Sequence, residues 1–261
     1  MRVQEGLRVW VRLITLFCWT ITLFVFRLLA KPVRWVSPAG ERAVRGRVFR
    51  CWGRGALRII GCEVELAGVP PLPPYFFVSN HLSYVDGIVY AALLGEVFVG
   101  MQEIRGWPLI GSICAGMDTL FIERQRPRDV FRVNAEIVRV YDSGAGVIVF
   151  VESTTSFGQH VLPFKPALLQ GPAERGIPVH FASIRYYAID SDPEISTSVC
   201  WVDDTPFVEH ALRLLRRRRY GVRVQFGVEP ISADDRKVLA RMLEESVEVL
   251  LHKGQPDSVA V

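Results

Sequence analysis

The sequence has few cysteines, and none of them is placed like a disulfide partner or a zinc ligand. The five cysteines are odd in number and far apart in the 261-residue chain: Cys18, Cys51, Cys62, Cys114 and Cys200. They form no CxxC pair, and no cysteine and histidine have the spacing of a zinc site. This pattern excludes a disulfide-stapled secreted domain and predicts a protein of a reducing compartment that holds no metal.

Internal repeats and low-complexity segments are also lacking. The 21 glycines and 16 prolines are scattered, and hydrophobic residues make up 50% of the chain against 22% for charged residues. Fibrous, solenoid and disordered proteins are therefore excluded. A chain of this length can bury one substantial core, so we expect one main domain and a small N-terminal element.

The N-terminal hydrophobic run is short for a membrane span. Leu13 to Phe26 carry no charge, but as a helix this run extends about 21 Å, less than the roughly 30 Å hydrocarbon core. If Arg12 and Arg27 snorkel, the helix would reach from Val9 to Ala30, so a tilted span and a helix in the interface both remain open. We favour the interfacial helix over a span and over a buried core helix. No small-residue cleavage site follows the run, so we expect this helix to be retained.

Acidic residues are nearly absent from the segment that follows. Glu41 is the single acid among nine cations between Arg27 and Arg58, although the net charge of the whole chain is only +4. Apolar positions between these arginines predict an interfacial helix over 41–60, after a turn at 38–40. We therefore expect residues 1–60 to form a membrane-anchoring helical hairpin. The positive-inside tendency places the remaining domain, residues 61–261, on the cytoplasmic face of the inner membrane.

A basic run near the C-terminus, Arg216 to Arg219, lacks the aromatic residues that stack on bases. We expect no nucleic-acid partner and interpret the run as a solvated, membrane-facing or carrier-protein-facing patch. His160, His180, His210 and His252 are interpreted as structural or surface residues.

Beyond Gly61, short apolar runs alternate with segments of helical periodicity. The predicted strands are 62–66, 75–79, 97–101, 119–122, 147–151, 179–184, 197–202 and 222–228, and the predicted helices are 83–94, 128–141 and 233–252. The last helix is expected to open with a capping pattern at Ser232 and Asp235 and to close at Gly254. This alternation predicts an α/β domain with a mixed, largely parallel sheet flanked by helices, whose ligand sites lie at the carboxyl ends of strands.

One strand leads into a candidate catalytic pair. His81 follows the predicted strand 75–79, and Asp86 lies in the first turn of the next predicted helix. Residues five apart on one helix differ by about 140° in direction, so His81 must precede the helix if the two side chains are to meet. Asp86 would then fix the imidazole tautomer, and the other nitrogen could accept a proton from a hydroxyl. The simpler alternatives are a capping box of Ser83 with Asp86 and a structural histidine at a strand end.

Four ordered segments carry a resemblance to a known family. Asn80-His81-x-x-x-x-Asp86 resembles the first motif of the 1-acylglycerol-3-phosphate acyltransferase family, and 116–124, 150–156 and 176–179 resemble the second, third and fourth motifs. The resemblance implies His81 and Asp86 as catalytic residues, with no cofactor. Substrate-binding residues are implied at the remaining matched positions: Asn80, Arg124, Glu152, Ser153, Thr154 and Thr155.

The third motif departs from the family pattern FPEGTRS. Val151 replaces proline, Ser153 replaces glycine and Thr155 replaces arginine, whereas Glu152 and Thr154 are retained. Threonine cannot supply the bidentate, charged contact that arginine makes with phosphate. Ser153 also places a Cβ atom where the family has glycine, at a position where the backbone can require dihedral angles that only glycine adopts easily.

The segments 154–165 and 201–210 resemble the bacterial branch that includes lyso-ornithine lipid acyltransferases. We therefore expect transfer of an acyl group from acyl-CoA or acyl-carrier protein to lyso-ornithine lipid or a related lysolipid. The alternatives are an acyltransferase that makes phosphatidic acid from 1-acylglycerol-3-phosphate, and a non-catalytic lipid-binding protein. A metal-dependent hydrolase is disfavoured because the sequence lacks a second ligand cluster. The oligomeric state is left open.

Overall fold

The computed structural model describes residues 2–107, 110–189, 195–202 and 205–253. The N-terminal helices are α1 (Arg2–Ala30), α2 (Val33–Val36) and α3 (Pro38–Ile60). The strands are β1 (Cys62–Ala67), β2 (Tyr75–Ser79), β3 (Val97–Met101), β4 (Leu120–Ile122), β5 (Gly146–Val149), β6 (Val179–Tyr187) and β7 (Tyr220–Phe226). The other helices are α4 (Tyr84–Leu93), α5 (Gln102–Arg105), α6 (Ile110–Gly116), α7 (Pro127–Asp142), α8 (Gln170–Arg175), α9 (Ile195–Val199), α10 (Phe207–Arg216) and α11 (Arg236–His252), with a short 3₁₀ turn (Pro166–Leu169) before α8. The helix end predicted at Gly254 lies outside the described residues.

The strands form one sheet in the order β1-β7-β6-β2-β5-β3-β4. Neighbouring strands are parallel except β6 and β7, which are antiparallel. β2 is the middle strand, and all five of its residues are buried, as expected for a parallel strand covered on both faces. The predicted α/β fold with a mixed, largely parallel sheet is confirmed.

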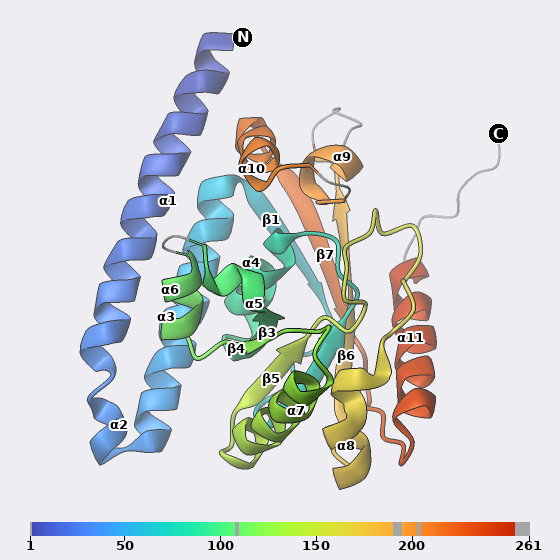
Figure 1. Cartoon of the computed structure of the whole chain (residues 1–261). Helices are drawn as coiled ribbons and strands as arrows, with labels where there is room; N and C mark the ends of the chain where they lie inside the picture. The colour runs from blue at the N-terminus through green and yellow to red at the C-terminus, as the bar shows by residue number, and fades with distance from the viewer. Residues whose placement is uncertain (1, 108–109, 190–194, 203–204, 254–261) are drawn as a thin grey trace, which may run out of the picture.

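Helices cover both faces of this sheet (Figure 1). One hydrophobic cluster joins α3, α4 and α10 to the sheet and includes Val89, and the other joins α7, α8 and α11 and includes Ile137. Side chains of a strand alternate between faces, so Phe77 of β2 belongs to the first cluster and Phe76 to the second. β2 is therefore held from both sides, and its carboxyl end at Ser79 is a fixed point.

The helices α1 and α3 run side by side as the predicted N-terminal hairpin (Figure 1). The Trp19 indole N–H donates to the Trp52 carbonyl at 3.1 Å. The segment Gln4–Val36 is long and apolar enough to cross a membrane by length and composition, and the mean hydropathy of an 18-residue window within it is 2.1. Large hydrophobic side chains are exposed on α1 and α2, among them Leu29 (75% exposed) and Trp35 (87%).

The arginines at the ends of the hydrophobic run face the protein. Arg12 donates to the carbonyls of Leu215 at 3.1 Å and Arg218 at 2.8 Å. Arg27 is 1% exposed and pairs with Glu41 at 2.5 Å. The snorkelling that would lengthen the apolar helix is therefore not seen. Because α3 packs against α4, the hydrophobic core continues across residue 60. The division into a membrane anchor (1–60) and a catalytic domain (61–261) therefore stays a prediction about the function of each part.

Three local predictions were wrong. In place of the strand expected at 197–202, the structure has the last three residues of the helix α9, followed by three residues outside any helix or strand. The turn expected at 38–40 is the first turn of α3, where Pro38 takes the first helical position and the Ser37 hydroxyl accepts from the Gly40 N–H at 3.0 Å. In α11, the N-cap is Asp235 alone, which accepts from the Lys237 N–H at 2.8 Å.

Candidate active site

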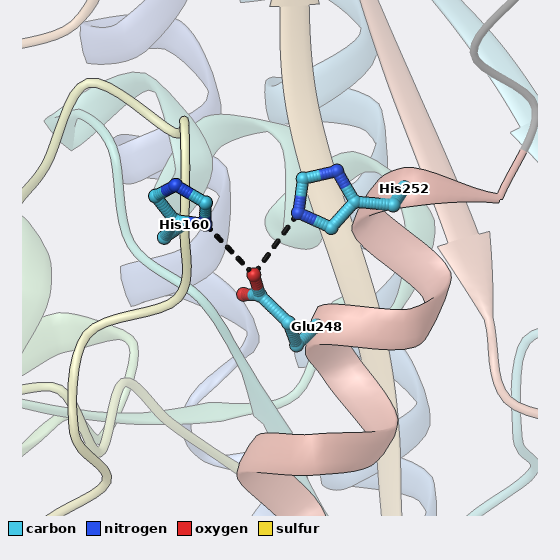
Figure 2. Close-up of side chains that lie close together, drawn as sticks. All are labelled: His160, Glu248 and His252. Atoms are coloured by element: carbon cyan, nitrogen blue, oxygen red, sulfur yellow. Dashed lines mark hydrogen bonds and ion pairs between the residues drawn. The ribbon is translucent and has the colours of Figure 1, made fainter. Parts of the chain in front are cut away.

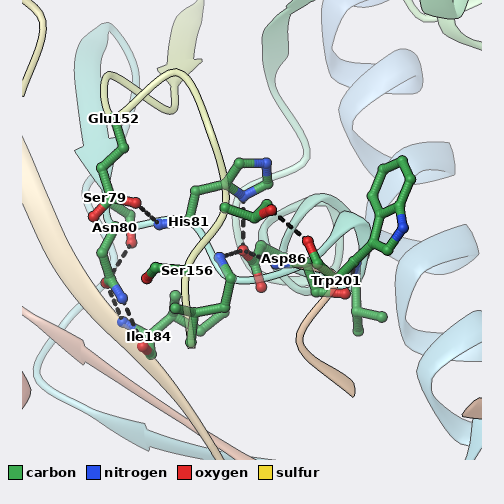
Figure 3. Close-up of polar contacts among 12 residues, drawn as sticks. Ser79, Asn80, His81, Asp86, Glu152, Ser156, Ile184 and Trp201 are labelled. Carbon is green, nitrogen blue, oxygen red and sulfur yellow. Dashed lines mark hydrogen bonds and ion pairs between the residues drawn. The ribbon is translucent and has the colours of Figure 1, made fainter. Parts of the chain in front are cut away.

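Asn80 ties the end of β2 to β6. Its amide N–H donates to the Ile184 carbonyl at 2.9 Å, and its amide oxygen accepts from the Ile184 N–H at 2.8 Å, as Figure 3 shows. The side chain thereby satisfies backbone groups where the chain leaves the sheet. Asn80 was predicted to bind substrate, but its side chain is fully buried. This geometry fixes the path of the chain into His81.

His81 and Asp86 meet as predicted from their spacing. Asp86 Oδ2 lies 2.7 Å from His81 Nδ1 and also accepts from the N–H groups of Leu82 at 2.6 Å and Ser83 at 3.0 Å. Asp86 Oδ1 accepts from the Tyr186 hydroxyl at 2.6 Å. The contact with Ser83 is half of a capping box that starts α4. The capping box and the histidine pairing, which were alternative interpretations of the sequence, therefore coexist in one carboxylate.

The protonation pattern of His81 follows from these partners. A carboxylate can only accept hydrogen bonds, so the imidazole donates from Nδ1, and Nε2 of the neutral ring is left as an acceptor. Figure 3 shows the ring with one nitrogen toward Asp86 and the other turned away. The ring is stacked on Phe150, with centroids 4.1 Å apart, and the side chain is 21% exposed. The site therefore presents an oriented, accessible base at the carboxyl end of the central strand.

Glu152 supports His81 from inside the protein. One carboxylate oxygen accepts from the His81 N–H at 2.9 Å and the other from the Leu162 N–H at 2.9 Å. Burial raises the pKa of Glu152 to about 8, against the lowering effect of these two hydrogen bonds. The side chain is 1% exposed. Its carboxyl group contacts the backbone of the site, and its role as a substrate-binding residue stays a prediction.

The loop after β5, residues 150–165, covers the other side of His81 and is called here the motif-3 loop. Its Ser156 N–H donates to the His81 carbonyl at 3.0 Å. The Thr155 hydroxyl donates to the Trp201 carbonyl, and the Trp201 N–H donates to the Leu82 carbonyl at 2.8 Å. Thr155 therefore links the motif-3 loop to the segment at Trp201, and both segments hold the His81-Leu82 backbone.

Ser153 has the left-handed backbone that the sequence led us to suspect. Its φ is +67°, a conformation that glycine adopts without penalty and that costs other L-residues about 1 to 2 kcal/mol. Its carbonyl accepts from the Arg124 guanidinium. The predicted site residues Arg124 and Thr154 are both exposed, so they lie on the outer side of the motif-3 loop.

Two residues of this site were not predicted as site residues. Tyr186 comes from β6 and is 100 positions from Asp86 in the chain, and no local pattern links them. Phe150 precedes the retained Glu152, but nothing in the motif indicates that its ring would stack on an imidazole. A cavity of about 450 Å³ is lined in part by Leu82 and Tyr186, which both donate hydrogen bonds to Asp86.

The central parallel strand and the oriented histidine at its carboxyl end form a site that is suited to general-base chemistry on a hydroxyl group. A family model described as Acyltransferase matches residues 63–184. The chain is 34% identical to a lyso-ornithine lipid O-acyltransferase of Brucella abortus, over 92% of this chain and 95% of that protein. It is 27% identical to a 1-acyl-sn-glycerol-3-phosphate acyltransferase of Neisseria gonorrhoeae, over 88% and 90% of the two chains.

A solved structure has the same fold. The crystal structure of the 1-acyl-sn-glycerophosphate acyltransferase PlsC from Thermotoga maritima covers 97% of this chain and 99% of its own, with a TM-score of 0.64 and 18% identity. The chain belongs to the Acyltransferase family, which the sequence motifs predicted.

Proposed function

We propose that this protein transfers a fatty acyl group from an acyl thioester to the hydroxyl of a lysolipid, with lyso-ornithine lipid as the preferred acceptor. The observation that carries the proposal is the 2.7 Å contact of His81 Nδ1 with a fully buried Asp86, which leaves Nε2 accessible. The 34% identity to a lyso-ornithine lipid O-acyltransferase supports the choice of acceptor.

In the proposed reaction, His81 Nε2 removes the proton from the acceptor hydroxyl as its oxygen attacks the thioester carbonyl. The C–S bond breaks, an ester forms, and the imidazolium returns the proton to the leaving thiolate. Asp86 stabilises the positive imidazolium between these steps. Asn80 and Glu152 position the His81 backbone. No protein nucleophile or cofactor is required, because the thioester of CoA or acyl-carrier protein is already activated.

The membrane supplies the acceptor in this proposal. The exposed apolar side chains of α1 and α2 would insert into the lipid interface of the inner membrane, with the catalytic domain on the cytoplasmic side. The inward-facing Arg12 and Arg27 favour a helix lying on the protein and partly in the interface over an isolated span.

Thr155 is the main reason to prefer an acceptor without a terminal phosphate. Its hydroxyl is committed to the Trp201 carbonyl, and it carries no charge. Charge-assisted hydrogen bonds contribute about 1.5 to 3 kcal/mol each, so a phosphomonoester loses roughly ten- to a hundredfold in binding where an arginine is missing. Arg124 is exposed nearby and is proposed to contact the acceptor headgroup.

The test compares kcat/KM for lyso-ornithine lipid and lysophosphatidic acid. The acyl chain is the same in every assay, and it is supplied first as the CoA thioester and then as the carrier-protein thioester. We expect a preference for lyso-ornithine lipid. Thr155→Arg should shift the ratio toward lysophosphatidic acid by roughly tenfold or more, whereas Thr154→Arg adds the same charge to an exposed neighbour and should shift it less. A tenfold preference of the unmodified protein for lysophosphatidic acid would instead establish the alternative activity. No product with either acceptor would favour the non-catalytic lipid-binding alternative.

A further inference from the structure

A second cluster of titratable side chains lies between the motif-3 loop and α11, away from His81 and Asp86. His160 Nδ1 and His252 Nε2 each lie 3.0 Å from Glu248 Oε1, and Figure 2 shows both rings directed at this one oxygen. One ligand atom from each of the three residues lies within 4.8 Å of the others.

This arrangement has the composition of a transition-metal site. Two imidazoles and one carboxylate are ligands that Zn²⁺ accepts, and ligand atoms around a tetrahedral Zn²⁺ are about 3.3 Å apart. The two separations of 3.0 Å from Glu248 Oε1 are about 0.3 Å below this value, and the two imidazole nitrogens lie within 4.8 Å of each other. We propose that His160, Glu248 and His252 bind a divalent transition metal of the zinc type, with the fourth position open to water.

The site is accessible and was not visible in the sequence. The side chains of His160 and His252 are 78% and 40% exposed, so an ion can enter from solvent. Glu248 and His252 are one turn apart on α11, but His160 precedes Glu248 by 88 residues. The expectation of no metal depended on the spacing of residues along the chain, and spacing does not detect ligands that converge from a loop and a distant helix.

A metal here would replace the direct contact between His160 and Glu248 with coordination of both residues, and it would act beside two other connections between α11 and the motif-3 loop. Glu248 Oε2 already accepts from the Val161 N–H at 2.6 Å, and Glu244 accepts from the Phe164 N–H at 2.8 Å. The same loop donates from Ser156 to the His81 carbonyl. Metal binding would therefore stabilise the loop that holds the backbone of His81, without contributing an atom to the acyl-transfer reaction.

The experiment uses the full chain in detergent, prepared without a histidine tag and stripped with a chelator. Titration with Zn²⁺ is followed by calorimetry and by thermal unfolding. We expect one ion per chain with a micromolar or tighter dissociation constant and a rise in Tm. His160→Ala, Glu248→Gln and His252→Ala should each weaken binding by about tenfold or more, since each removes one of three protein ligands. Glu245→Gln, a change to an exposed neighbour on α11, should leave binding unchanged.

Substitution with Co²⁺ identifies the ligands independently. The visible spectrum should show tetrahedral bands without the strong thiolate bands that binding to the exposed Cys18 or Cys51 would give. The proposal is overturned if Zn²⁺ at ten times the protein concentration neither binds nor raises Tm, or if the three variants bind it as tightly as the unmodified protein. Either result would leave the acyl-transfer proposal untouched, because the metal takes no part in that chemistry.

Discussion

Asp86 Oδ2 lies 2.7 Å from His81 Nδ1 and 2.6 Å from the Leu82 nitrogen. Three consecutive residues between β2 and α4 therefore contact the same carboxylate oxygen of Asp86. Because the Tyr186 hydroxyl holds the other oxygen at 2.6 Å, the carboxylate has no freedom to rotate. The imidazole is thus oriented before any substrate arrives, and the capping role of Asp86 can be separated from its role toward His81 by mutation.

The first prediction separates these roles. Ser83→Ala removes the hydroxyl that caps α4 and should lower the free energy of unfolding by about 0.5 to 2 kcal/mol, with acyl transfer largely retained. Asp86→Asn keeps the shape but places an amide among donors, and it should reduce kcat by about 10²- to 10⁴-fold. Transfer assays and urea unfolding of both variants measure the difference. Equal losses of activity in the two variants would mean that Asp86 acts as a cap alone.

The second prediction concerns the pH dependence of stability. Burial raises the pKa of Glu152 from 4.5 to about 8, so the folded protein holds a proton there that the unfolded chain has released. The folded state binds more protons between these values, and stability from this group is present below pH 4.5 and is lost as pH rises to about 8. We expect Tm to fall over this range.

Glu152→Gln removes this titration and is the matching variant. It should be less stable than the unmodified protein at pH 6, because both oxygens of the protonated carboxyl group can accept from the N–H groups of His81 and Leu162, whereas an amide nitrogen cannot accept a hydrogen bond. Its Tm should then decline less between pH 6 and 8.5. Glu245→Gln, at an exposed position, is the control. A decline as steep in Glu152→Gln as in the unmodified protein would assign the pH dependence to other groups.

The third prediction tests the altered third motif. Ser153→Gly should raise the free energy of unfolding by about 0.5 to 1 kcal/mol, because the relief of a left-handed serine exceeds the extra flexibility of glycine in the unfolded chain. Ser143 has an ordinary φ of −74°, so Ser143→Gly should be neutral or destabilising. Urea unfolding of the two variants decides the matter. A Ser153→Gly variant less stable than the unmodified protein would show that the serine side chain contributes more than its backbone costs.

The fourth prediction concerns the N-terminal hairpin. Leu29 and Trp35 are highly exposed on α1 and α2, so Leu29→Glu with Trp35→Glu should weaken association with anionic vesicles by about tenfold or more, since each buried apolar side chain contributes roughly 1.5 to 3 kcal/mol. Substitution is preferable to truncation, because Arg12 and Trp19 bond α1 to the rest of the protein. Val228→Glu changes an exposed apolar residue after β7 (91% exposed) and serves as the control. Undiminished flotation of the double variant with vesicles would place the membrane contact elsewhere.

Much of the fold could be predicted because central strands such as β2 and β5 are buried at every position and consist almost entirely of apolar residues. The bounds of β2 and β3 were predicted to the residue. The segment 197–202 was misjudged because its threonine, valine and tryptophan residues favour strands, whereas Val199 is buried against the core in a short helix. Tertiary burial outweighed local preference there.

The candidate site was predictable where its residues are close in the chain. His81 and Asp86 could be paired from a strand-to-helix junction alone. Tyr186 could not, because its link to Asp86 depends on β6 lying beside β2. The resemblance to the family pointed to Asn80 and Glu152 as site residues. It could not show that their buried side chains bond to the backbone, because those bonds form only when separate segments of the chain pack together.

The central claim is that His81 is the base of an acyl transfer, and the most direct measurement is the kcat of His81→Ala with lyso-ornithine lipid and a saturating acyl thioester. His180→Ala, which changes a histidine on β6 outside the His81–Asp86 pair, is the control and should retain most activity. The account predicts that His81→Ala remains folded and membrane-associated but loses about 10²- to 10⁴-fold in kcat. A loss of less than about tenfold, within the range of ordinary packing effects, would contradict it.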